Sequence, residues 1–132
     1  MTSTSAEAQW KQINVKEAQE KLEAGNAIVI DVRMPFDYAG GRVPTSVNLP
    51  GESLRYRKQV VPEGKELLIL SIDGSGSAAV CALALKLGYE GVYNIEGGMA
   101  AWEEAGFAIE SISEGVASPP RPEEPKPETP AT

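Results

Sequence analysis

Three short, mostly apolar runs constrain the fold of this chain more than any other feature. They cover residues 27–32, 67–70 and 92–95. Short apolar runs of this kind are typical of strands that are buried on both faces. Helix signals lie between the runs, so strands and helices alternate along the chain. This alternation predicts an α/β fold of three layers (α/β/α), in which helices cover both faces of a central parallel sheet.

The helix signals are local and specific. Asn14 and Glu17 have the spacing of a capping box, and Gly25 is placed to end the helix that they begin. Further helices are predicted over residues 77–87 and 98–105. Short helical turns are predicted over 34–38 and 53–59, and a short strand over 46–49.

Composition excludes several classes of function. The chain has 132 residues and a formal net charge of −7, so bulk electrostatics do not favour binding to nucleic acid or to an anionic membrane. No apolar run is long enough to span a bilayer, and the first residues lack the basic and apolar regions of a signal peptide. We therefore expect a cytoplasmic protein without a nucleic-acid or membrane partner.

The absence of histidine is the strongest chemical constraint. It removes Ser–His and Cys–His activation of a nucleophile, and also histidine-ligated zinc. The single cysteine, Cys81, excludes an internal disulfide and any site built from several cysteines. We expect neither a metal nor a cofactor.

A small polar loop follows the second buried run. Its residues can turn backbone N–H groups toward an anion at the start of the next helix, or they can simply make a tight turn. Spacing alone leaves these two interpretations open. In a parallel sheet, ligands bind beyond the carboxyl ends of the strands, where Asp31 also falls. The candidate loop consists of Ser71, Ile72, Asp73, Gly74, Ser75, Gly76 and Ser77.

Four motifs in order resemble the rhodanese homology domain. They are the strand end IVIDVR (28–33), the segment GRVPTSVNLP (41–50), the loop 71–77 and the closing GGMAAW (97–102). The resemblance covers about residues 12–110. It implies a parallel five-stranded α/β domain. It also implies a nucleophilic cysteine in a C-x-x-G-x-R-S loop, which carries sulfur as a persulfide to an acceptor such as cyanide or a thiol.

The sequence departs from this pattern at the loop. In the alignment Ser71 takes the place of the cysteine, Gly76 that of the arginine, and Arg42 that of a histidine in the second segment. A persulfide requires a polarisable sulfur, which a hydroxyl cannot supply. Loss of the loop arginine together with the added Asp73 weakens attraction for an anion.

Other residues have two interpretations each. Asp31 and Arg33 are candidates to position a ligand, although a structural ion pair is favoured. Arg42 is a candidate to restore positive charge at the pocket mouth.

Cys81 could be a substitute nucleophile, but a buried core cysteine is favoured. The basic cluster Arg55, Arg57 and Lys58 could dock an acidic partner, but a solvated helix face is favoured.

The domain organisation predicted is a flexible segment over 1–11, a rhodanese-like domain over 12–110 and a disordered tail over 111–132. The tail is rich in proline and glutamate and lacks the apolar residues needed for a core. Its PxxP spacings allow an SH3-type ligand or a linker, but a solvated tail is favoured.

The favoured function is non-catalytic: a binding or regulatory module for a small anion, a sulfur-containing ligand or a protein partner. The alternative is a thiosulfate or persulfide sulfurtransferase whose native or ancestral residue at position 71 is cysteine. In the native case the serine would be an engineered change. Phosphate-ester chemistry and a serine hydrolase rank lower, since Ser71 has no base and the chain has no G-x-S-x-G motif.

Overall fold

A parallel sheet with helices on both faces forms the core of the computed structural model, which describes residues 9–57, 61 and 64–111. The sheet is five-stranded, as the resemblance implied, with the order β1-β5-β4-β2-β3. The elements in chain order are β1 (Lys11–Ile13), α2 (Val15–Ala24), β2 (Ala27–Asp31), α3 (Pro35–Gly40), β3 (Val47–Asn48), η1 (Ser53–Tyr56), β4 (Glu66–Leu70), α4 (Ala78–Lys86), β5 (Val92–Ile95) and α5 (Gly98–Glu104).

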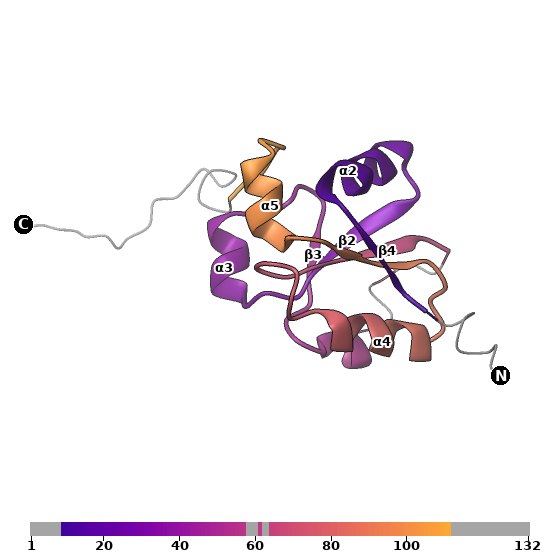
Figure 1. Cartoon of the computed structure of the whole chain (residues 1–132). Coiled ribbons are helices and arrows are strands. Elements are labelled where there is room, and N and C mark those ends of the chain that lie inside the picture. The colour runs from indigo at the N-terminus through magenta and orange to yellow at the C-terminus, as the bar shows by residue number, and fades with distance from the viewer. Residues whose placement is uncertain (1–8, 58–60, 62–63, 112–132) are drawn as a thin grey trace, which may run out of the picture.

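The three layers arise because successive side chains of the buried strands point to opposite faces of the sheet. Helices α2 and α5 cover one face of the sheet and α4 covers the other, while α3 lies near its carboxyl edge (Figure 1). Ile30 and Ile69 belong to the cluster that contains the buried residues of α4. Val29 and Leu68 belong to the cluster that contains Trp102 of α5. Successive strand residues therefore fill opposite cores, which confirms the predicted three-layer α/β fold.

The first helix is the clearest agreement between sequence and structure. The amide of Glu17 donates to Oδ1 of Asn14 at 2.8 Å, and the amide of Asn14 donates back to Oε1 of Glu17 at 2.9 Å. Gly25 ends the helix in the left-handed conformation, with φ of 87°. Both features are short-range, so the sequence alone could specify them.

The edge strand β1 is the element that the sequence interpretation missed. It begins at Lys11, one residue before the expected domain boundary, and pairs with β5 in parallel. The residue before it, Trp10, packs against the core cluster on the α4 side. Three residues are too few to show a strand pattern, and only the neighbouring β5 makes this segment a strand.

Several predictions fall partly or wholly on residues that the structure does not describe. The predicted helical turn over 53–59 is the 3-10 helix η1, and residues 58–60 lie outside the described residues. So do residues 1–8 and 112–132, and with them most of the expected flexible N-terminus and disordered tail. Within the described part, no helix has the length and apolar character to cross a bilayer.

Candidate functional site

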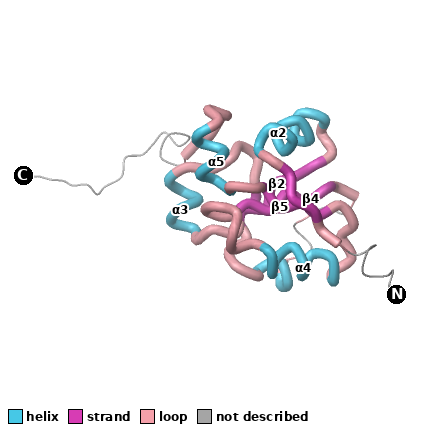
Figure 2. The backbone as a smooth tube through the Cα atoms, in the orientation of Figure 1, coloured by secondary structure: helices cyan, strands magenta, loops and turns pink. Residues whose placement is uncertain are grey.

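The candidate loop lies between the end of β4 and the start of α4, at the carboxyl edge of the sheet (Figure 2). Asp31 at the end of β2 is the register partner of Leu70, the residue before Ser71. The amide of Val32 donates to the carbonyl of Leu70 at 2.9 Å. The structure thus brings the backbones of the two predicted site segments side by side.

Ser71 faces into the loop that it begins. Its side chain accepts a hydrogen bond from the amide of Gly74 at 2.9 Å, and the residue is only 6% exposed. The hydroxyl oxygen of Ser77 lies 3.5 Å from that of Ser71. The position aligned with the family nucleophile is therefore a buried hydroxyl whose oxygen already holds the loop together.

A polar network beneath the loop connects it to the edge of the sheet. The hydroxyl of Ser77 donates to Oδ1 of the buried Asn94, whose amide nitrogen donates to Oε1 of Gln12 at 2.7 Å and to the carbonyl of Gly74 at 3.1 Å. Because Oδ1 of Asn94 can only accept, the single hydroxyl hydrogen of Ser77 points to Asn94. Toward Ser71 the oxygen of Ser77 is then only an acceptor, and a neutral hydroxyl is too weak a base to remove a proton.

Asn94 and Gln12 were not predicted as part of the site. The signal for Asn94 was an amide inside an otherwise apolar buried run, since a buried polar side chain needs hydrogen-bond partners. No signal marked Gln12, because its role depends on pairing between β1 and β5, which are far apart in sequence.

Helix α5 supports the loop through a pair of glycines. The amides of Met99 and Ala100, in its first turn, donate to the carbonyls of Ser71 and Ile72 at 2.8 and 3.0 Å. Gly98 has φ of 57°, and a Cβ there would collide with the carbonyl oxygen of Ser71. The glycine pair of the closing motif thus allows the helix to approach the loop, and buried Trp102 anchors it.

The loop carries a negative charge at its surface. The carboxylate of Asp73 accepts from the side chain of Ser75 at 2.6 Å and from its amide at 3.0 Å. These two hydrogen bonds, the side-chain one first, lower the pKa of Asp73. Asp73 is therefore ionised at neutral pH, which disfavours an anion near it. Ile72 is 61% exposed and so does not fill the loop.

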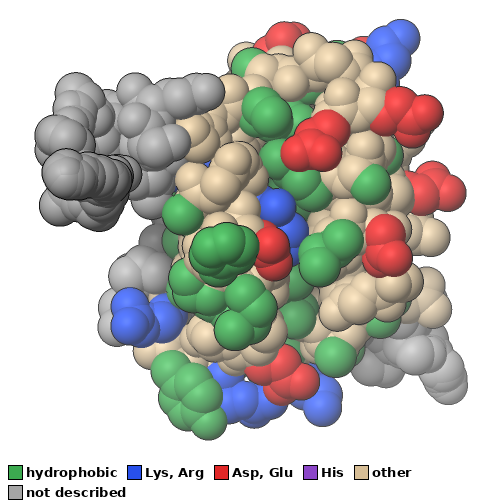
Figure 3. Space-filling model, turned by 90° about the vertical axis from the view of Figure 1, so that its left-hand side faces the viewer, with side chains coloured by type: hydrophobic (Ala, Val, Ile, Leu, Met, Phe, Trp, Pro, Cys, Tyr) green, Lys and Arg blue, Asp and Glu red, His purple; other side chains and the backbone are tan. Residues whose placement is uncertain are grey.

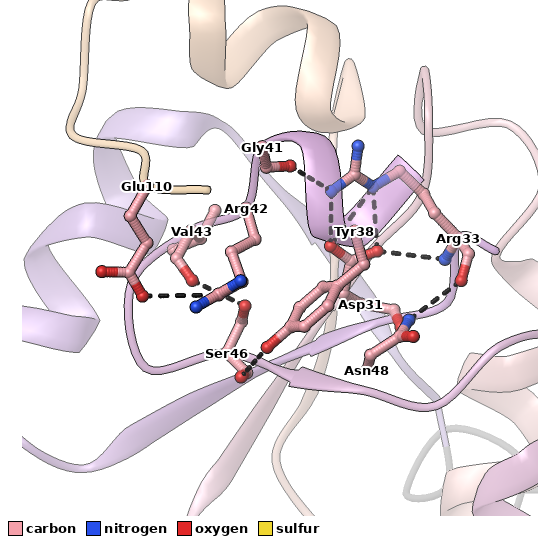
Figure 4. Close-up of polar contacts among 9 residues, drawn as sticks. All are labelled: Asp31, Arg33, Tyr38, Gly41, Arg42, Val43, Ser46, Asn48 and Glu110. Atoms are coloured by element: carbon pink, nitrogen blue, oxygen red, sulfur yellow. Dashed lines mark hydrogen bonds and ion pairs between the residues drawn. The ribbon is translucent and has the colours of Figure 1, made fainter. Parts of the chain in front are cut away.

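Asp31 and Arg33 form a buried pair beside the loop, drawn in Figure 4. The guanidinium of Arg33 donates to both carboxylate oxygens of Asp31, at 2.8 to 3.2 Å, and to the carbonyl of Gly41 at 2.7 Å. The side chains are 0% and 8% exposed. This geometry supports the structural interpretation, because these bonds turn the charge of Arg33 inward.

Arg42 pairs with Glu110, close to the last described residue of the chain. Its Nε lies 3.4 Å from Oε2 of Glu110, and its guanidinium carbon lies 5.1 Å from the centre of the Tyr38 ring (Figure 4). Two backbone hydrogen bonds also join Arg42 to Glu110. Arg42 therefore contacts Tyr38 and Glu110. The candidate role at the pocket mouth remains a prediction.

Cys81 is a core residue of α4. It is fully buried, and burial raises its pKa to about 12. A thiol with this pKa is protonated at neutral pH and so is a poor nucleophile. The favoured interpretation of Cys81 as a core cysteine agrees with this geometry. Among the described residues, no group of three or more acidic, cysteine or histidine side chains could hold a metal ion.

Comparison with known proteins identifies the fold and its family. Residues 14–105 match the model of the family described as Rhodanese-like domain. A rhodanese-related protein from Thermoplasma volcanium is 28% identical, with a TM-score of 0.68 over 76% of this chain and 98% of the other. A rhodanese-like domain protein from Staphylococcus aureus is 27% identical, with a TM-score of 0.66 over 78% of this chain and 100% of the other.

A third similar structure carries a different description. It is a protein of unknown function, and possible tyrosine phosphatase, from Rhodopseudomonas palustris, with 26% identity and a TM-score of 0.69 over 81% of this chain and 89% of the other. Proteins that share this fold thus carry different descriptions, and the fold alone does not decide what a chain can do.

Proposed function

This chain belongs to the rhodanese-like domain family, and we propose that it is a catalytically inactive member that acts as a binding or regulatory module. One observation carries the proposal. Ser71 stands where the family resemblance implies the nucleophilic cysteine, and its buried hydroxyl oxygen is occupied by the amide of Gly74. The module would take a small anion, a sulfur-containing ligand or a protein partner, and we place it in the cytoplasm.

The chemistry of the loop argues against sulfur transfer. A persulfide intermediate is an S–S bond, and an oxygen nucleophile cannot form one. Ser71 also lacks a base: the chain contains no histidine, and the neighbouring Ser77 is a neutral hydroxyl that donates its hydrogen bond to Asn94. Cys81 does not replace the missing sulfur, because it is buried in α4 with a pKa of about 12.

Weak anion binding is compatible with the same geometry. The loop precedes α4, whose first N–H groups and positive dipole end favour an anion. Gly76 stands where the family pattern has arginine, and ionised Asp73 opposes a second negative charge. A small anion would therefore bind through backbone amides with little help from side-chain charge.

The second candidate function is sulfur transfer by a natural chain with cysteine at position 71. Family membership favours it. A phosphatase is disfavoured because Ser71 lacks a base and the loop length matches the sulfurtransferase type.

Mass spectrometry of the protein after incubation with thiosulfate tests the proposal. We expect no covalent addition of a sulfur atom to the parent chain. The Ser71→Cys variant tests the capacity of the loop, and Cys81→Ala controls for the remaining thiol. Sulfur addition to the parent that survives in Cys81→Ala would show that the loop is chemically competent and would reject the proposal.

A further inference from the structure

Four large hydrophobic side chains are exposed in the segments that follow β2, β3 and β4. The exposed fractions are 63% for Met34, 88% for Phe36, 77% for Tyr56 and 61% for Ile72. Single exposed apolar residues are ordinary, but a group on one side of a monomer indicates a binding surface. We call these four residues the apolar rim.

The topology places the apolar rim at one edge of the sheet. Ile72 follows β4, Met34 and Phe36 follow β2, and Tyr56 lies in η1, which follows β3. These strands are neighbours in the order β4-β2-β3 and are all parallel, so their carboxyl ends share one edge. Figure 3 views the side of the molecule where α3 lies, and hydrophobic side chains gather over the middle and lower part of this face.

The charges beside Tyr56 are positive in an otherwise acidic protein. Arg55 and Arg57 flank Tyr56 and are both exposed. Arg55 forms an exposed ion pair with Glu52 at 2.7 Å, which competes only weakly with a further partner because such pairs are solvated. An occupant that combines apolar and acidic groups therefore complements the apolar rim, with its acidic groups at the Tyr56 end beside the arginines and away from Asp73.

The chain's own C-terminal segment starts beside this edge. Arg42 and Glu110 exchange two backbone hydrogen bonds, of 2.8 and 2.9 Å, so the chain reaches Ser111 close to the end of α3. Phe36 lies in the same short helix, about 15 Å or less from Arg42 by the rise of a helix and an extended chain. Residues 112–132 follow directly, and in an extended proline-rich form they could span about 65 Å.

We propose that the Pro/Glu-rich segment 112–132 docks on the apolar rim of its own chain, with prolines against Phe36 and Tyr56 and glutamates beside Arg55 and Arg57. The segment contains six prolines and four glutamates. Aromatic-lined surfaces bind polyproline segments because such segments lose little conformational entropy on binding. Tethering adds an effective concentration in the millimolar range, so even a weak contact is populated.

This docking does not depend on the proposed function. The apolar rim is available to the segment whether or not the loop transfers sulfur. A separate Pro-rich partner could bind the same surface only by displacing the segment.

Paramagnetic relaxation in the full chain tests the docking directly. A nitroxide is attached to a Thr129→Cys variant, since Cys81 is buried and its raised pKa protects it from labelling. We expect strong relaxation enhancement at the amides of Asp37, Arg57 and Ile72. We expect little at Gly25 and Gly88, which lie beside the amino ends of β2 and β5.

Variants of the apolar rim separate docking from simple tethering. The double variant Phe36→Ser with Tyr56→Ser should lower the enhancement at Arg57 and Ile72 by at least about fivefold, because loss of each aromatic contact is expected to weaken docking about fivefold. Arg57→Glu should lower it at Ile72, whereas Lys86→Glu, an exposed charge reversal at the far end of α4, should not. Enhancement that centres on Arg42 and is unchanged in the variants of the apolar rim would overturn the proposal.

Discussion

The hydroxyl oxygen of Ser71 accepts the amide of Gly74 at 2.9 Å, so the residue at the nucleophile position closes the loop in which it stands. Ser77, the last residue of the loop, is hydrogen-bonded to buried Asn94 of β5. The amides of Met99 and Ala100 in α5 hold the start of the loop. These contacts hold the loop in place through its own side chains and through the first turn of α5. The first predictions follow from those contacts.

Replacement of Ser77 by alanine should destabilise the fold more than its small size suggests. The change leaves Oδ1 of buried Asn94 without a donor, and an unsatisfied buried acceptor costs about 1–3 kcal/mol. Urea unfolding of Ser77→Ala should show this loss. Ser75→Ala, an exposed serine of the same loop, is the matched control and should change stability by about 0.5 kcal/mol or less. Equal effects in the two variants would contradict the buried network.

A methyl group at Gly98 should displace the loop. Gly98 and Gly106 both have positive φ, of 57° and 79°, so alanine strains the backbone at either position by about 1 kcal/mol. Only at Gly98 does the added Cβ also meet the loop, at the carbonyl of Ser71 and 2.7 Å from the amide nitrogen of Gly74. Gly98→Ala should therefore lower the midpoint of thermal unfolding well below that of Gly106→Ala. Comparable midpoints would show that α5 does not support the loop as described.

The pair of Asp31 and Arg33 should prove to be structural. Arg33→Met leaves the fully buried carboxylate of Asp31 without its cation, and breaking a buried pair in this way costs about 3–5 kcal/mol. Arg55→Met breaks an exposed pair and should cost about 1 kcal/mol or less. Chemical unfolding of both variants checks the contrast. A small loss in Arg33→Met would favour a role of this arginine in ligand binding instead.

Burial of Cys81 should make stability depend on pH in the alkaline range. In the unfolded chain the thiol loses its proton near pH 9, whereas in the folded chain it keeps it up to about pH 12. Between these values the unfolded state binds fewer protons, so the free energy of unfolding falls as pH rises. Urea unfolding from pH 8 to pH 11 should show a fall in the parent that is steeper than in Cys81→Ala. Parallel curves would place the thiol in contact with solvent.

Short-range signals account for the parts of the fold that the sequence predicted. The capping box of Asn14 and Glu17, the left-handed Gly25 and the three apolar runs need no knowledge of distant residues. The loop 71–77 could be located from the sequence because a predicted strand precedes it and a predicted helix follows it. Both predictions depend only on residues that are close in the chain. The bounds of these elements differ from expectation only by a residue or two, as fraying ends would.

Long-range partners account for what the sequence did not predict. Strand β1 exists because β5 lies beside it, and the link from Asn94 to Gln12 exists because those two strands pair. The contacts of Arg42 with Glu110 likewise join residues far apart in the chain. None of these contacts leaves a periodic pattern in a single sequence.

We propose that this rhodanese-like domain does not transfer sulfur. The most direct test measures thiocyanate formation from thiosulfate and cyanide by the purified parent chain and by Ser71→Ala. We expect both rates to equal the rate without protein, since the only sulfur nucleophile of either chain is the buried Cys81. A parent rate well above that of Ser71→Ala would contradict it, because that rate would have to come from the serine itself.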